Sequence, residues 1–216
     1  MLRHFKILKK IFFFISIIMI GIPIAISISI YTYEKLNDSL IENSINSLQT
    51  SIFSNDRDKL NELIIRKQEH LKDITPLIQL AENNEKAIET QINLTRKISK
   101  HSSGSFNSRT NTPETKAGLI NNVKSPIFIL KGNFFSGYSF ELRKVYIEIS
   151  PFENINGYKI FLNNKLVNKS LIKKESETLI IGPLIPGKYQ LKISNHSNKI
   201  YKRDIQLLQP NTFIDL

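Results

Sequence analysis

The stretch YKIFLNNKLV, residues 158–167, indicates a β-hairpin. Its first five residues, Tyr158 to Leu162, are mainly apolar and lie in a region of the chain with a two-residue period, as β-strands have. Asn163 and Asn164 follow, a good pair for a tight turn because asparagine tolerates left-handed backbone. Leu166 and Val167 then begin a return strand. This part of the chain is therefore predicted to form antiparallel β-sheet.

The same two-residue period continues on both sides of the hairpin. Further strands are predicted at residues 127–130, 138–142, 145–149, 178–181, 188–193 and 199–208. Pro186 and Gly187 fit the central pair of a type II turn, in which glycine takes a positive φ. Strands at this spacing, joined by polar turns, predict a β-sandwich module over residues 119–216.

Residues 32–100 have the composition of helices, with no Gly and one Pro. Asn55 or Asp56 is expected to cap one helix, and Thr75-Pro76 to open another that ends at Asn83-Asn84. The expected apolar stripes are Leu36, Leu40, Ser44, Leu48 and Ile52; Leu60, Leu63, Ile64, Lys67 and Leu71; Leu77, Ile78, Leu80 and Ala81; and Ile88, Ile92, Thr95 and Ser99. They predict a small helical domain rather than a solvated coiled coil, because no heptad is sustained. Residues 101–118, rich in Ser, Thr, Asn and Gly, are expected to be a flexible linker.

The run IFFFISIIMIGIPIAISISI, residues 11–30, contains no charge and is long enough for a transmembrane helix, which we expect over residues 11–31. Arg3, Lys6, Lys9 and Lys10 precede it, so residues 1–10 are expected to be cytoplasmic and the bulk of the chain extracellular. A signal peptide cleaved near residues 25–27 is the alternative, although its cut would fall inside the apolar run. A buried core helix fits less well, because the run has no polar face. The expected fold class is therefore α+β: a transmembrane helix, a helical domain and an antiparallel sandwich.

Several segments resemble one family of membrane proteins. They are NGYKIFLNNK at residues 156–165, IGPLIPGKYQLK at 181–192, IFSNDRDKL at 52–60 and PLI at 76–78. The first two resemble the extracellular β module of TcaA-like, teicoplanin-resistance-associated proteins of Gram-positive bacteria, and the wider PEGA-type modules. The last two resemble that family's helical domain outside the membrane. The resemblance implies a cell-envelope protein linked to the response to wall-targeting antibiotics, and it implies no catalytic residues.

The chain departs from that family in two ways. Many such proteins begin with a cytoplasmic zinc ribbon, whereas this chain has no Cys and only ten residues before its apolar run. Many also continue into further β modules, whereas this sequence contains one. Functions that reside in those parts are not expected here.

The net charge of +11 is unevenly distributed along the chain. Residues 32–100 are near neutral, with 10 bases and 11 acids, whereas residues 101–216 carry 16 bases and 8 acids. The bases that we expect to contact an anionic partner are Lys159, Lys165, Lys169, Lys173, Lys174, Lys188, Lys192, Lys199, Lys202 and Arg203. Such a surface attracts polyanions, and an extracellular location favours teichoic acid or another anionic wall polymer over nucleic acid. A basic face that serves only solubility is the competing interpretation.

Catalytic motifs are missing from the sequence. Four histidines, His4, His70, His101 and His196, lie in separate segments without metal-ligand spacing, and no phosphate-binding or nucleophile-elbow glycine pattern occurs. Asp56, Asp58 and Glu62 are better explained as helix N-terminal charges than as a carboxylate site. We therefore expect neither an enzyme nor a cofactor. The leading hypothesis is a single-pass membrane protein that binds wall polymer; the alternative is an accessory or signalling subunit that contacts a partner membrane protein through its helical region.

Overall fold

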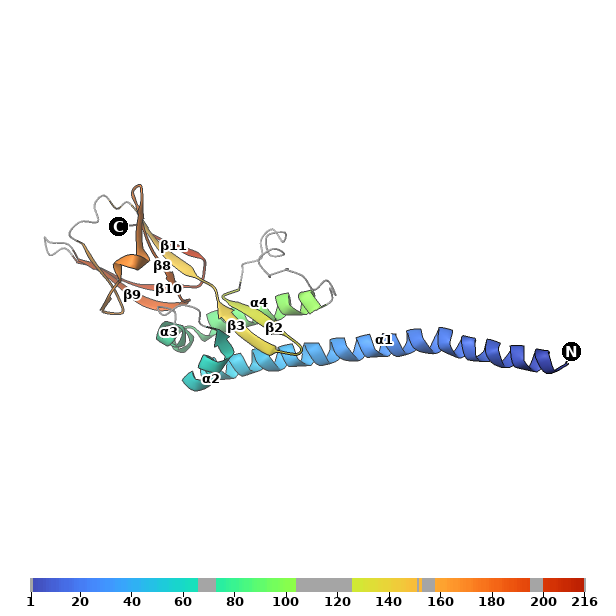
Figure 1. Cartoon of the computed structure of the whole chain (residues 1–216). Helices are drawn as coiled ribbons and strands as arrows, with labels where there is room; N and C mark the ends of the chain where they lie inside the picture. Colours follow the sequence, from blue (N-terminus) through green and yellow to red (C-terminus); the bar gives the residue numbers. More distant parts are fainter. Residues whose placement is uncertain are drawn as a thin grey trace.

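A computed structural model of the chain shows one long helix followed by a compact body (Figure 1). The structure describes the backbone of residues 2–65, 73–103, 126–150, 152, 158–194 and 200–215. Within these ranges, the side chains of residues 2–12, 14, 16, 18 and 101–103 are not described. The linker predicted at 101–118 therefore lies almost wholly outside the described residues.

Among the described residues, the first half of the chain contains four helices. They are α1 (Leu2–Phe53), α2 (Arg57–Leu63), α3 (Thr75–Asn83) and α4 (Glu85–Ser103). Asp56 caps α2 as predicted, because its Oδ1 accepts a hydrogen bond of 3.0 Å from the backbone N–H of Lys59. Helix α3 differs from the prediction: Ile74 is its N-cap residue, and the Thr75 N–H bonds instead to the Asp73 carboxylate at 3.1 Å. Asn84 ends α3 and its Oδ1 accepts from the N–H of Ala87 at 3.2 Å, so one residue separates two helices.

The apolar positions of these helices meet in one core, but the stripe predicted over 60–71 is cut short, because α2 ends at Leu63 and Ile64 begins β1. Lys67 and Leu71 lie outside the described residues. The predicted positions in α3 and α4 are all buried, including Thr95 and Ser99. In α1 the stripe is partly wrong: Leu48 and Ile52 are buried, but Leu36 and Leu40 are exposed, and Ile41 and Ile45 take the buried positions. Arg96 of α4 ties the two helices together, because its Nε lies 2.7 Å from Glu42 Oε1 of α1.

A small sheet of three strands lies against these helices. It has the order β1-β3-β2, where β1 is Ile64–Ile65, β2 is Phe128–Asn133 and β3 is Gly137–Leu142. β1 runs parallel to β3, and β2 is antiparallel to it. The α4 side chains fix the start of β2: Gln91 Oε1 accepts from the Ile127 N–H at 3.1 Å, and the Thr95 hydroxyl donates to the Phe128 carbonyl at 3.0 Å. The strands predicted at 127–130 and 138–142 therefore pack with the helices and are not part of the two larger sheets.

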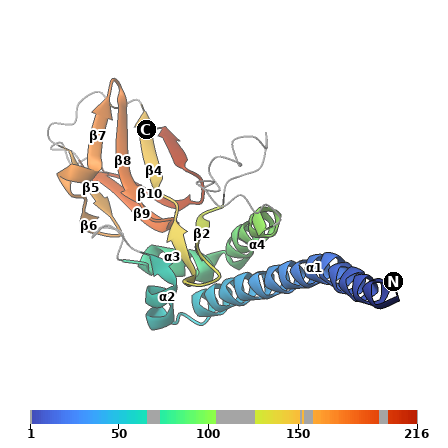
Figure 2. The same ribbon diagram turned by 45° about the vertical axis from the view of Figure 1, so that its right-hand side comes forward.

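Two four-stranded sheets form the rest of the body (Figure 2). The first has the order β10-β9-β5-β6, with β5 at Lys159–Leu162, β6 at Lys165–Leu166, β9 at Gly187–Ser194 and β10 at Ile200–Leu207. The second has the order β11-β4-β8-β7, with β4 at Val145–Ser150, β7 at Ile172–Glu175, β8 at Thr178–Leu184 and β11 at Asn211–Asp215; a short 3-10 helix, η2 (Lys169–Leu171), precedes β7. Pairing is antiparallel except for β11 with β4. Buried side chains of both sheets join one apolar cluster, and we call β4–β11 the sandwich.

The turn chemistry of the sandwich was predicted correctly at one site and wrongly at another. Asn163 and Asn164 both have positive φ, as a two-residue hairpin turn requires. Gly187, however, is not the positive-φ residue of a type II turn; it begins β9 and is buried. A Cβ on Gly187 would lie 2.5 Å from the backbone carbon of Pro76. This glycine is needed because α3 passes so close to β9, at the junction between the helices and the sandwich.

The overall result is a mixed α+β protein with a helical N-terminal part and sheets that are mainly antiparallel, as predicted. Within the residues that the structure describes, no helix is both long and apolar enough to span a membrane. The transmembrane helix predicted at 11–31 gains no support from that finding. The side chains of the basic segment 1–10 lie outside the described residues.

Candidate anion-binding face

The structure divides the ten predicted basic residues among several surfaces. Four of them share the outer face of the sheet β10-β9-β5-β6: Lys159, Lys188, Lys192 and Lys202. Lys188 and Lys192 alternate with buried residues along β9, and Lys202 and Lys159 pair with outward-facing residues of that strand. Lys165 and Arg203 lie on the same sheet but pair with the inward-facing Leu162 and Leu191, so they point to the other side at the sheet edges. Lys169, Lys173 and Lys174 lie on η2 and β7 of the other sheet, and Lys199 lies outside the described residues.

The strand register brings two of these cations directly opposite each other. Lys192 of β9 pairs with Lys202 of β10 on one side and with Phe161 of β5 on the other. The Lys192 ammonium lies 5.6 Å from the centroid of the Phe161 ring, within range of a cation–π interaction. Lys159, two residues before Phe161, extends the charge along β5. Like charges opposite each other on neighbouring strands destabilise a sheet, so this pair contributes nothing to folding.

Apolar side chains lie beside the lysines on the same face. Leu166 pairs with Phe161 and is 64% exposed, and Ile200 pairs with Ser194 and is 60% exposed. One row across the sheet therefore reads Lys202, Lys192, Phe161, Leu166. We call this surface the basic–apolar face; it consists of Lys159, Phe161, Leu166, Lys192, Ile200 and Lys202.

In the part of the chain that the structure describes, no carboxylate forms an ion pair with the lysines of the basic–apolar face. Among the described residues, Lys159, Lys192 and Lys202 make no ion pair. The acid on this face, Asp204, lies one row away and accepts a hydrogen bond from Gln190 Nε2 at 3.3 Å. By contrast, Lys165 Nζ lies 3.4 Å from Asp73 Oδ2, and Lys188 Nζ donates to Asn83 Oδ1 at 3.1 Å. These two lysines have partners within the fold.

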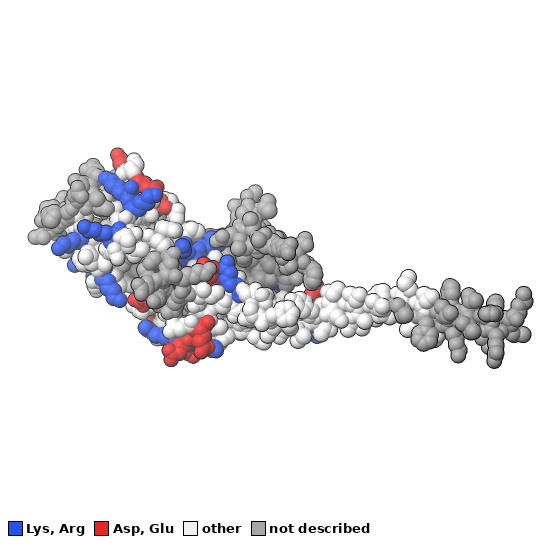
Figure 3. Space-filling view, viewed as in Figure 1, with Lys and Arg blue, Asp and Glu red and all other residues white. Residues whose placement is uncertain are grey.

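The outer face of the other sheet has a different charge. It carries acidic residues: Glu148 and Asp215 alternate with buried isoleucines of β4 and β11 and so face outward, and Glu175 ends β7. Lys173 on this face pairs with Glu175, whose carboxylate raises the pKa of the lysine. Basic side chains gather over the sandwich in Figure 3, and acidic ones gather over α2. The ion pair on this side contrasts with the lysines of the basic–apolar face, which make no ion pair among the described residues.

The described residues hold no cluster of side chains that could bind a metal ion. No group of three or more His, Cys, Asp or Glu side chains among them could hold a metal ion. Asp56 is a helix cap and Glu62 forms a 2.8 Å ion pair with Lys59, so both have structural partners. The side chains of all four histidines lie outside the description.

The sequence analysis missed the apolar half of this face. A two-residue turn fixes the register of its hairpin, so Asn163-Asn164 already places Phe161 opposite Leu166. That signal could have revealed the pair. Assigning Lys192 and Lys202 to one row needed the β9–β10 register, which depends on residues between the strands. The chain matches no model of a known protein family, and no curated protein matches it.

Proposed function

We propose that this protein is a single-pass membrane protein whose sandwich, outside the cytoplasm, binds an anionic wall polymer such as teichoic acid without catalysis. The observation that carries the proposal is Lys192 opposite Lys202, next to Lys159, without an ion pair among the described residues. The pair costs stability, and among the described residues no carboxylate offsets its charge. A polymer that carries one phosphate per repeat would neutralise such a row of charges.

The apolar neighbours suit a polymer of this kind. Phe161, Leu166 and Ile200 offer contact area to the carbon backbone of a sugar- or polyol-phosphate chain, while the lysines attract its phosphates. The row is a flat sheet surface, and an extended polymer can lie across it. The link to antibiotic response is part of the proposal and rests on the resemblance to TcaA-like proteins.

Membrane anchoring is supported by the surface of α1 between residues 13 and 30. Described side chains on every side of this helix are apolar and exposed, among them Met19 at 71%, Ile20 at 63% and Ile28 at 60%. A helix that is apolar all round is stable when it is surrounded by lipid or protein. The hydroxyls of Ser27 and Ser29 donate to the carbonyls four residues earlier, at 2.8 Å each, so neither needs water. The four preceding basic residues support an N-terminus in the cytoplasm.

A binding assay on purified cell walls tests the polymer-binding function. The full-length protein in mild detergent is expected to sediment with the walls and to be released by salt, because phosphate neutralisation is salt-dependent. The double variant Lys192→Glu/Lys202→Glu is expected to lose at least about tenfold in affinity through repulsion of the phosphates. Walls stripped of teichoic acid should retain neither protein.

The matched control keeps the total charge of the test variant. Lys169→Glu/Lys173→Glu removes two cations from the other sheet, so its net charge equals that of the double variant. If both variants bind equally weakly, a general charge effect explains the attraction and the basic–apolar face is not the site. Unchanged binding to stripped walls would overturn the choice of polymer.

An accessory role is the second candidate, and it rests on two other exposed residues. Leu36 and Leu40 of α1 are 52% and 39% exposed just beyond the apolar run, on the helix surface that the body leaves open. A partner membrane protein could pack there. This role predicts that one specific membrane protein co-purifies with the chain and is lost with Leu36→Ser/Leu40→Ser, whereas Lys192→Glu/Lys202→Glu retains it.

A further inference from the structure

The tip of the β2–β3 hairpin carries an aromatic side chain that the fold leaves uncovered. Phe134 and Phe135 lie in the turn between Asn133 and Gly137. Phe135 is 88% exposed, more than any other large apolar side chain among the described residues. An aromatic ring in this position contributes no burial to folding, so its exposure needs another explanation.

Hydrogen bonds within the turn hold the tip in one shape. Asn133 Oδ1 accepts from the backbone N–H groups of Phe135 and Ser136, at 2.9 and 3.0 Å. The N–H of Asn133 in turn donates to the Ser136 hydroxyl oxygen at 3.3 Å. Gly137 takes a φ of 77°, which closes the turn at low cost. Phe135 is thus presented by a built turn.

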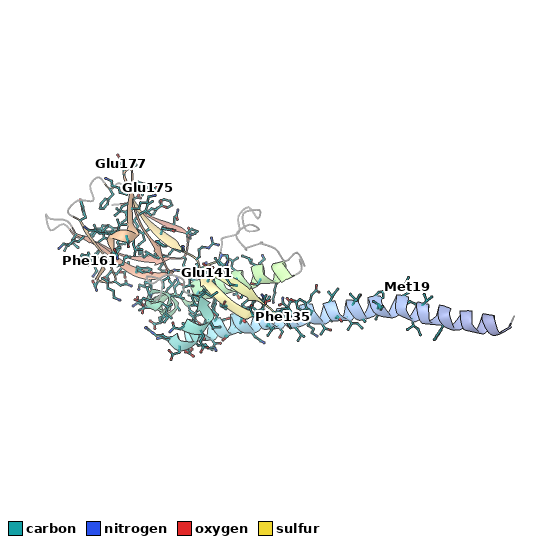
Figure 4. The ribbon with its side chains drawn as sticks, in the orientation of Figure 1. Met19, Phe135, Glu141, Phe161, Glu175 and Glu177 are labelled. Carbon is teal, nitrogen blue, oxygen red and sulfur yellow. The ribbon has the colours of Figure 1, made fainter. Side chains whose placement is uncertain are left out.

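The tip lies beside α1 where the apolar run ends. The Phe134 ring stacks on Tyr33 with a centroid distance of 5.0 Å, and Phe135 touches Phe134 edge-on at 5.4 Å. The hydroxyl of Tyr138, on the same hairpin, donates to Asn37 Oδ1 of α1. Tyr33 follows Ile30 by three residues, which corresponds to a rise of about 4.5 Å. Figure 4 shows Phe135 next to α1, on the side of the body that faces Met19.

We propose that the hairpin tip, with Phe134 and Phe135, inserts into the headgroup region of the membrane that α1 crosses. This inference rests on the anchor in the proposed function. Tyr31, which is 66% exposed, and Tyr33 place aromatic residues on α1 at the same level. Together the four rings form an aromatic belt, the arrangement that favours a membrane interface. The body is then attached to the membrane at two points, α1 and the tip.

Single-tryptophan reporters test the insertion directly, because the chain contains no Trp. Phe135→Trp, Ile20→Trp and Phe213→Trp are made in the full-length protein and reconstituted into phosphatidylcholine vesicles with brominated acyl chains. Phe135→Trp is expected to be quenched most by bromine near the headgroups, and Ile20→Trp most by bromine near the bilayer centre. Phe213, 72% exposed on β11, is the matched control, and its Trp should remain unquenched.

The reporters separate failure of this inference from failure of the anchor. If Ile20→Trp is quenched but Phe135→Trp is not, α1 crosses the membrane and the tip does not enter it. If Ile20→Trp is also unquenched, the anchor itself is wrong. An unquenched Phe135→Trp whose emission is nonetheless shifted to the blue would show that protein covers the tip, which also overturns the inference.

Discussion

The parts of helix α1 before residue 31 and after residue 40 both contain isoleucines, but their surroundings are opposite. In the half after residue 40, Ile41, Ile45, Leu48 and Ile52 are buried against α3, α4 and the small sheet. In the half before residue 31, isoleucines such as Ile20 and Ile28 remain exposed, because the body does not reach them. The helix itself is continuous from Leu2 to Phe53. An apolar side chain of α1 therefore stabilises this protein in water only where the body covers it, whatever its residue type.

The largest difference between the halves is expected for matched Ile→Ala substitutions. Ile45 is fully buried, so Ile45→Ala should leave a cavity and lower the free energy of unfolding by about 3 kcal/mol. Ile24, which is 54% exposed, has no protein neighbours to lose, so Ile24→Ala should leave that free energy unchanged. Urea unfolding of the full chain in mild detergent measures both. Equal losses would show that the first half of α1 also packs on the body.

A matched pair of glycines sharpens the comparison. The Cβ of Gly187→Ala would overlap the backbone and ring of Pro76, which cannot move independently of α3, so we expect a loss of about 2 kcal/mol. The Cβ of Gly21→Ala in α1 would have nothing within 4 Å, and no loss is expected. Urea unfolding in mild detergent measures both glycine variants. An unaffected Gly187→Ala protein would mean that α3 and β9 are less closely packed than described.

A smaller effect is expected where polar groups join the buried half of α1 to α4. Arg96→Met removes the cation 2.7 Å from Glu42, whose other oxygen, Oε2, is buried, and should cost about 1–2 kcal/mol. Without Arg96, only Lys100 among the described residues, at 3.4 Å from Oε2, still pairs with the Glu42 carboxylate, and Glu42→Gln in the same background removes that charge. The double variant should therefore recover part of the stability, measured by urea unfolding as a double-mutant cycle. Strictly additive losses would contradict a direct interaction.

The smallest effect is expected for Asp73, because this residue and its ion-pair partner Lys165 both remain exposed to water. The hydroxyl and N–H of Thr75, and then Lys165, hold the pKa of Asp73 below its usual range. The stabilisation is therefore complete above the unfolded carboxyl pKa, about 3.9, and is lost as pH falls through the lower folded value. Asp73→Asn should cost about 0.5 kcal/mol at neutral pH, since exposed pairs contribute little, and the difference from the parent protein should vanish in acid. A difference that grows in acid would contradict this sign.

Local patterns in the sequence predicted much of the fold. The stripes of α3 and α4, the cap at Asp56 and the Asn163-Asn164 turn all depend on residues within a few positions of each other. The stripe of α1 was shifted because Leu36 and Leu40 continue the helical spacing past the point where the body ends. Periodicity shows which side chains could share a face, but not which of them the rest of the chain covers.

Contacts between distant segments could not be predicted in this way. β1 pairs with β3 across more than seventy residues, so the hairpin of residues 128–142 joins the helices although its period matches that of the sandwich. The Pro186-Gly187 pattern was assigned to a turn because no local signal shows that Pro76 lies against Gly187. The ten basic residues could be named from the sequence, but the surfaces on which the described ones lie follow from strand register.

The short passage from β3 to β4 has a mechanical consequence. Residues 143 and 144 alone separate these strands, and Arg143 is held by the carbonyls of Ile127 and Pro126 at 2.8 and 3.0 Å. The Pro76–Gly187 contact braces the same junction from the other side. These two sets of contacts restrict rotation of the sandwich relative to the helices. A lateral force on the sandwich is therefore transmitted to α1 as torque. If the proposed polymer binding and membrane anchor hold, load on the bound polymer would change the tilt of α1.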